Sequence, residues 1–182
     1  YQAYADYEDI MKLTENLISE SVKKATGSFK ITYQETPLDF EPPFERITLR
    51  DAILKYAEVD ISDDVSVLTA KAKSLGLDVS NNPQKGHLIN TIYDKSVEQH
   101  LIQPTFITDY PWETSPLAKR KRDNPDLVER FELIVNGMEI ANAFSELNDP
   151  EDQLDRFLDQ KKAKESGDDE AHEMDEDFIN AL

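Results

Sequence analysis

The stretch FELIVNGMEIANAFSELND, residues 131–149, decides the fold, because an Asn136-Gly137 step separates two apolar segments with strand-like alternation. Asn-Gly between such segments is a strong signal for a two-residue β-hairpin turn. The turn pairs Ile134 with Glu139, so Glu132 and Glu139 become diagonal neighbours on one face. Two interpretations stay open: a solvated sheet face, or a site for Mg²⁺ or Mn²⁺, which prefer oxygen ligands.

Helical periodicity elsewhere predicts the elements around this hairpin. We expect a helix over residues 5–26 that begins at an Asp6 N-cap and stops at Gly27. Thr48 is expected to cap a short helix over residues 49–56. Strands are predicted at residues 29–34 and 104–111, and three prolines at residues 35–48 limit strand pairing there.

Residues 60–101 read as a helical insertion, with two helical segments on either side of a polar link at residues 81–86. The chain is therefore divided into residues 1–59, 60–101 and 102–182.

After the hairpin, Asp149 is expected to cap a helix that starts at Pro150 and turns Leu154, Phe157 and Leu158 inward. An acidic, solvated stretch follows at residues 167–177, and a short helix ends the chain. The predicted fold class is α+β, with antiparallel strands, flanking helices and the helical insertion.

Composition excludes several classes of protein. The 182 residues include 20 Lys and Arg but 38 Asp and Glu, a net charge of −18. Such a surface repels nucleic-acid backbones, except at the basic run KRKR, residues 119–122. There are no cysteines, which fits a reducing compartment, and no apolar run reaches the roughly 20 residues that span a bilayer. A cytoplasmic location is expected. The chain begins without Met, which suggests a fragment or a processed form.

Motifs of several enzyme classes are missing from the sequence. There is no dinucleotide-binding or P-loop glycine pattern, no GxSxG elbow and no HExxH spacing. His87 and His100 are expected to be ordinary polar residues on the insertion helices, and His172 stands apart from both.

Long unbroken runs resemble class II lysyl-tRNA synthetases. They are YQAYADYEDIM, PTFITDYPWETSPLAK, RFELIVNGMEIANAFSELNDPEDQLDRF and GDDEAHEMDEDFINAL. The lysine-pocket pattern of that family, E-I-[GA]-N-[GA]-[FY]-x-E-L, stands whole as EIANAFSEL. The resemblance covers essentially the whole chain and is weakest over residues 60–101. It places the chain between motifs 2 and 3 of the catalytic domain.

The resemblance implies a role for individual residues. Glu132 and Glu139 match the acids that hold Mg²⁺ on ATP. Tyr1, Asn142, Phe144 and Glu146 match the lysine pocket: Glu146 receives the ε-ammonium, Tyr1 supplies a nearby hydroxyl, Asn142 lies at the carboxylate end and Phe144 forms a wall. The implied reaction makes lysyl-adenylate from lysine and ATP and transfers lysine to tRNA(Lys), in an enzyme expected to be a homodimer.

A geometric conflict follows, because strict alternation from Glu139 would turn Asn142, Phe144 and Glu146 to the face opposite the two acids. One extra residue in the second strand, a β-bulge, restores a common face. We therefore predict a bulge or ladder break between Glu139 and Asn142.

The resemblance also implies that parts of the active site lie outside the chain, namely motif 1, the motif 2 and motif 3 arginines and the anticodon-binding domain. The fragment alone is therefore expected to be inactive. Two rival interpretations remain: a truncated paralogue that lysylates a protein, and a non-catalytic interaction domain whose acids are simply solvated.

Overall fold

A computed structural model describes residues 1–79, 83–165 and 174–182 of the chain. Part of the polar link predicted at residues 81–86, most of the acidic stretch predicted at residues 167–177, and His172 lie outside the described residues.

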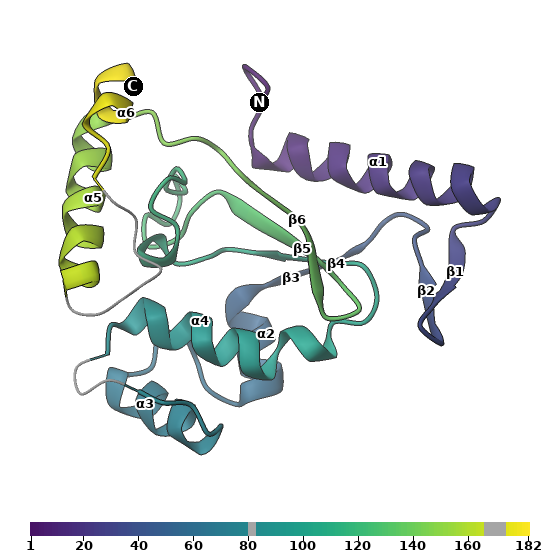
Figure 1. The fold of residues 1–182 in the computed structure, drawn as a ribbon, viewed down its shortest axis with the longest axis horizontal. Coiled ribbons are helices and arrows are strands. Elements are labelled where there is room, and N and C mark those ends of the chain that lie inside the picture. Colours follow the sequence, from purple (N-terminus) through teal and green to yellow (C-terminus); the bar gives the residue numbers. More distant parts are fainter. Residues whose placement is uncertain (80–82, 166–173) are drawn as a thin grey trace.

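The described residues form helices and short strands in the following order (Figure 1). The elements are α1 (Tyr7–Thr26), β1 (Lys30–Tyr33), β2 (Thr36–Asp39), β3 (Glu45–Thr48), α2 (Leu49–Ala57), α3 (Val65–Ser74), α4 (Lys85–Ser96), the 3₁₀ turn η1 (Glu98–His100), β4 (Thr105–Thr108), the 3₁₀ turn η2 (Trp112–Thr114), β5 (Arg130–Val135), β6 (Met138–Phe144), α5 (Pro150–Glu165) and α6 (Glu176–Ala181).

The main sheet has the strand order β3-β4-β5-β6. β4, β5 and β6 are antiparallel, whereas β3 and β4 run parallel. Parallel neighbours need a long crossover, and here it is made by α2, α3 and α4 between β3 and β4. The predicted α+β class with antiparallel strands is confirmed, and the β3–β4 pair adds one parallel neighbour to the sheet.

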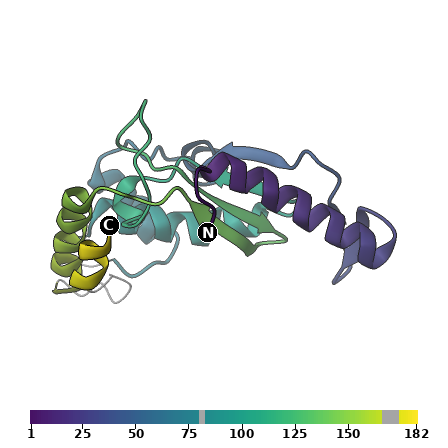
Figure 2. The same cartoon turned by 90° about the horizontal axis from the view of Figure 1, so that it is seen from above.

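Helices cover both faces of this sheet (Figure 1). α1 lies on one face, where Tyr7 and Met11 share a core with Phe106, Phe131 and Leu133. α2, α3 and α4 lie on the other face, where their apolar residues pack with Ile107 and Ile134. Figure 2 shows the β1–β2 hairpin at one end of the molecule and α5 with α6 at the other.

The predicted helix ends are confirmed. Asp6 accepts hydrogen bonds from the Glu8 and Asp9 amides in a capping box, and Gly27 ends α1 with φ of 82°. Thr48 accepts from the Asp51 amide at the start of α2. Asp149 caps α5 by accepting from the amides of the two residues after Pro150.

The prolines limit strand pairing as expected, because β2 pairs only with β1 and Pro37 therefore sits in an edge strand. An expectation about α5 was wrong. On α5, Leu154 and Leu158 are 41% and 40% exposed, and only Phe157 is buried as expected. Gln153 and Arg156 take the inner positions instead, because polar loop carbonyls face that side.

The segment predicted to be a helical insertion contains α3, α4 and η1, and the described residues between 60 and 101 include no strand. His87 is exposed on α4, and His100 stacks on Tyr56 with ring centroids 5.0 Å apart. Both fit the ordinary roles that we expected for them. Among the described residues, no helix is long and apolar enough to cross a membrane.

Candidate functional site

The predicted bulge is present in β6. The ladder pairs Ile134 with Glu139 and Leu133 with Ala141, so Ile140 is the extra residue. Beyond it, Glu132 lies directly opposite Asn142. One additional residue therefore turns the later part of β6 over, and it places the acid pair and Asn142 on the same face.

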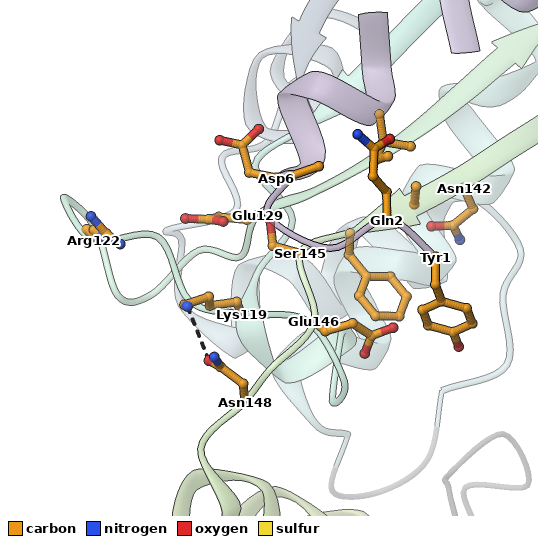
Figure 3. Close-up of a pocket in the computed structure, with 14 residues that line it drawn as sticks. Tyr1, Gln2, Asp6, Lys119, Arg122, Glu129, Asn142, Ser145, Glu146 and Asn148 are labelled. Carbon is orange, nitrogen blue, oxygen red and sulfur yellow. Dashed lines mark hydrogen bonds between the residues drawn. The ribbon is translucent and has the colours of Figure 1, made fainter. Parts of the chain in front are cut away.

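A pocket of about 720 Å³ opens where the N-terminal residues pass β6 (Figure 3). Tyr1, Asn142, Phe144 and Glu146, the four residues matched to a lysine pocket, all line it. The remaining lining residues include Gln2, Asp6, Ile10, Lys119, Arg122, Glu129, Ser145 and Asn148. The Ser145 hydroxyl accepts from the Tyr7 amide at 3.0 Å and so ties this wall to the start of α1.

Glu146 supplies negative charge at the pocket wall beside Tyr1 (Figure 3). Partial burial raises the pKa of the Glu146 carboxyl. A cation placed beside this carboxyl would favour its ionised form. A ligand ammonium would act in the same way and could gain a charge-assisted hydrogen bond.

Glu132 is not among the residues that line the pocket, and it is only 6% exposed. Burial raises the pKa of its carboxyl, and the charge of Glu139 adds to this, while Arg130 and Tyr110 act in the opposite direction. Glu139 is exposed, and like Glu132 it is not among the residues that line the pocket. The structure thus brings four predicted residues together in a pocket and sets the two acids beside it on the same sheet face.

Arg130 contacts both the acid pair and a residue of the pocket. Its guanidinium forms an ion pair with Glu132 and donates to Oδ1 of Asn142 at 3.2 Å. It also donates to the Ser115 hydroxyl at 2.8 Å and lies over the Tyr110 ring, 4.5 Å from the centroid.

A third carboxylate, Glu98, lies near the Glu132–Glu139 pair, and the sequence analysis did not single it out. Glu98 of η1 has its pKa raised to about 7, first by burial and then by the charges of Asp94, Glu132 and Glu139. The hairpin turn holds η1 in place, because the Gly137 amide donates to the Leu101 carbonyl at 3.1 Å. Negative charge is therefore concentrated where the acid pair lies.

These carboxylates fit a divalent cation as partners, although they do not form a complete cage. Glu132 and Glu139 offer the oxygen donors that Mg²⁺ prefers, and the charge of Glu139 makes ionisation of Glu132 more costly in the absence of a cation. Among the described residues, no group of three or more potential ligands is positioned to hold a metal. Such a pair suits Mg²⁺ that arrives with phosphate and keeps other ligands of its own.

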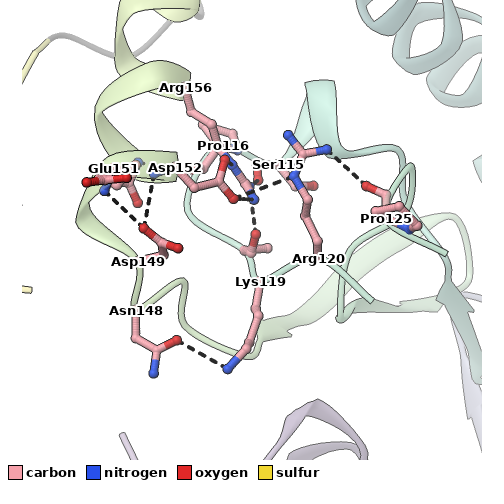
Figure 4. A network of polar contacts seen from close by, with 12 residues as sticks. Ser115, Pro116, Lys119, Arg120, Pro125, Asn148, Asp149, Glu151, Asp152 and Arg156 are labelled. Carbon is pink, nitrogen blue, oxygen red and sulfur yellow. Dashed lines mark hydrogen bonds and ion pairs between the residues drawn. The ribbon is translucent and has the colours of Figure 1, made fainter. Parts of the chain in front are cut away.

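The basic run at residues 119–122 is largely engaged within the molecule. Lys121 pairs with Asp109 at 2.8 Å, and Arg120 pairs with an α5 carboxylate and stacks on Trp112. Lys119 donates to Asn148 at 3.2 Å (Figure 4), and with Arg122 it lines the pocket. Internal ion pairs and hydrogen bonds thus neutralise part of the positive charge of residues 119–122, the one segment expected to attract nucleic acid.

Arg130 and Glu98 are the site residues that sequence reasoning missed. Arg130 had a usable signal, because it stands two residues before Glu132 and therefore shares its face of the strand. Glu98 had none, because only the tertiary packing of η1 on the hairpin turn brings it near the acids.

The fold and this site have a match among known families. The family model described as class II tRNA synthetases (D, K and N) matches residues 1–182. The chain therefore belongs to the class II tRNA synthetases of this D, K and N group.

Individual proteins with similar sequences are lysine–tRNA ligases. The lysine–tRNA ligase of Thermoanaerobacter sp. (strain X514) is 54% identical over 184 residues, and that of Thermotoga sp. (strain RQ2) is 53% identical over 183. The lysine–tRNA ligase of Shigella dysenteriae serotype 1 is 49% identical over 185 residues. In each case all of this chain is covered, and it spans 36–37% of the relative's length.

Proposed function

We propose that this chain is the part of a lysine–tRNA ligase that binds lysine and holds Mg²⁺–ATP. The observation that carries the proposal is the bulge at Ile140, because it brings the Glu132–Glu139 pair and Asn142 to one face beside a pocket that also contains Glu146. The names of relatives about 50% identical across the whole chain support the same function.

The pocket offers a partner for each end of a lysine molecule. Glu146 would accept the ε-ammonium, with the Tyr1 hydroxyl nearby and Phe144 against the aliphatic chain. Asn142, which precedes Phe144 in β6, would bind the carboxylate end of lysine. An uncharged analogue would leave the Glu146 carboxylate without its partner, which disfavours such ligands.

The reaction needs orientation and charge compensation more than a protein nucleophile. The lysine carboxylate would attack the α-phosphate of ATP to form lysyl-adenylate with release of pyrophosphate, and the lysyl group would then pass to the terminal ribose of tRNA(Lys) with release of AMP. Glu132 and Glu139 would hold Mg²⁺, which neutralises developing phosphate charge when it is bound. Holding both reactants in place supplies much of the remaining rate enhancement.

Several further features belong to the same proposal. We place the enzyme in the cytoplasm as a homodimer, with residues 60–101 as an insertion between the catalytic segments 1–59 and 102–182. Because the chain spans 36–37% of its relatives, we expect activity to require the full-length protein. A truncated paralogue that lysylates a protein is the nearest alternative, and the helical segment at residues 60–101 favours the tRNA-dependent enzyme over it.

Pyrophosphate exchange tests this function. Full-length protein with Mg²⁺ and ATP is expected to exchange labelled pyrophosphate into ATP only when lysine is present, and to load lysine onto tRNA(Lys). Absence of lysine-dependent exchange would contradict the enzyme assignment and favour a binding domain. Exchange with transfer to a protein, but none to tRNA, would favour the paralogue.

A further inference from the structure

We propose that Arg130 is the positioning residue that fixes which end of the Asn142 amide faces the ligand, and that it thereby couples the metal side of the site to the lysine side. This inference rests on the proposed function and adds a residue and a specificity device to it.

The argument begins with the contacts of one side chain. The Arg130 side chain is 16% exposed, and its guanidinium reaches Glu132, Asn142, the Ser115 hydroxyl and the Thr114 carbonyl. A guanidinium is planar and donates in fixed directions, so several acceptors together determine its position. The Tyr110 ring beneath it, which is buried, restricts movement out of that plane.

The chemistry of the pair then determines the orientation of Asn142. Arginine has donors only, so the Asn142 atom that faces Arg130 must be the acceptor Oδ1, and the structure has it there at 3.2 Å. The Nδ2 group, a pure donor, is left for the pocket that Asn142 lines. A donor at this point suits a carboxylate oxygen of an amino-acid ligand and rejects a second ammonium, which opposes binding of lysine in the reversed direction.

The same guanidinium also fixes one of the two acids. Arg130 and Glu132 lie two residues apart on one face of β5, and Glu132 pairs across the ladder with Asn142. The ion pair engages Oε1 of Glu132. One side chain therefore sets the positions of an acid proposed for Mg²⁺ and of an amide proposed for lysine.

The loop that contacts Arg130 is held in turn by a side chain of α5 (Figure 4). Arg156 of α5 donates to the Ser115 and Ala118 carbonyls at 3.2 and 2.7 Å, which fixes the loop whose Ser115 hydroxyl accepts from Arg130. The positioning therefore depends on contacts outside the pocket.

A double-mutant cycle on lysine binding tests the proposal. Lysine dissociation constants would be measured by calorimetry, without ATP, on full-length protein carrying Arg130→Met, Asn142→Ala or both changes. We expect each single variant to weaken binding about tenfold or more, as for loss of a hydrogen bond to a charged group. The double variant should be no more than about threefold weaker than the weaker-binding single variant, because Arg130 acts through Asn142.

Further variants separate positioning from general structure. Asn142→Asp keeps an acceptor for Arg130 but replaces the donor with negative charge, so it should weaken lysine binding at least as much as Asn142→Ala while the midpoint of thermal unfolding is unchanged or raised. Arg130→Lys should not restore affinity, since one ammonium cannot satisfy the same set of acceptors. Arg50→Met on α2, which breaks a surface pair with Asp60, is the matched control and should bind like the wild type.

Three results would overturn the proposal: multiplicative losses in the double variant, Arg130→Met binding within twofold of the wild type, or Asn142→Asp binding within twofold of the wild type. If Arg130→Met fails to fold, Asn142→Asp alone decides. A wild-type protein that binds no lysine would instead remove the proposed function, and this inference with it.

Discussion

The substitution Glu146→Gln tests the charge on the pocket wall. It keeps the size of the side chain and removes the carboxylate proposed to accept the ε-ammonium. A hydrogen bond to a charged group contributes about 1.5–3 kcal/mol. Because the Glu146 side chain is exposed to the pocket, solvent screening places the loss near the lower limit, at about 1.5–2 kcal/mol. We therefore expect the lysine dissociation constant to rise about 10- to 30-fold.

Calorimetry on the full-length protein measures this change, with Glu129→Gln as the matched control. Glu129 lines the same pocket, and Figure 3 shows it away from Glu146 and Tyr1. It should therefore change lysine binding by less than about threefold, and ATP affinity should stay the same in both variants. Equal losses of lysine and ATP affinity in Glu146→Gln would mean that Glu146 supports the fold. Equal losses of lysine affinity in the two variants would mean that only the overall charge of the pocket matters.

Three other changes are expected to have distinct outcomes. Glu98 prefers its proton in the folded state, with a pKa of about 7 against an ordinary 4.5, so its stabilising effect is complete below about pH 4.5 and is lost as the pH rises through 7. Glu98→Gln should accordingly raise the free energy of unfolding by about 1 kcal/mol at pH 8 without divalent cations, and by nothing at pH 4; an equal gain at both pH values would refute this. Arg156→Met should lower the free energy of unfolding by about 2–4 kcal/mol in denaturant titrations, because it leaves two buried carbonyls without their donor and Asp152 with Arg120 as its remaining partner, whereas a loss under 1 kcal/mol would contradict the buried network. Deletion of Ile140 removes only the bulged residue and should preserve lysine binding within about threefold, while deletion of Ala143 reverses the face of later residues and should abolish it; equal effects would argue against the bulge as the organising feature.

The parts of the fold that sequence predicted best are those set by local chemistry. Asp6, Gly27 and Thr48 act as helix ends because capping depends on residues a few positions away. The Asn136-Gly137 turn fixed the hairpin register for the same reason. The bulge required more than local rules, because only the resemblance demanded that Glu139 and Asn142 serve one site.

Features determined by distant contacts could not be predicted in the same way. The parallel β3–β4 pair depends on how the helical segment between them crosses the sheet. The inner face of α5 carries Gln153 and Arg156 because they meet loop carbonyls about 40 residues away, and apolar periodicity says nothing about such partners. Arg130 escaped notice because a basic residue at a strand start is usually solvated, and its partners become evident only when Ser115 and Asn142 are in place.

The most direct test of the central claim is a crystal structure of the full-length protein with lysine bound. The account predicts that the ε-ammonium lies within hydrogen-bonding distance of the Glu146 carboxylate and that the lysine carboxylate lies on the Nδ2 side of Asn142, with Arg130 still bound to Oδ1. Lysine bound in the reverse direction, or outside the pocket lined by Tyr1, Asn142 and Glu146, would contradict it.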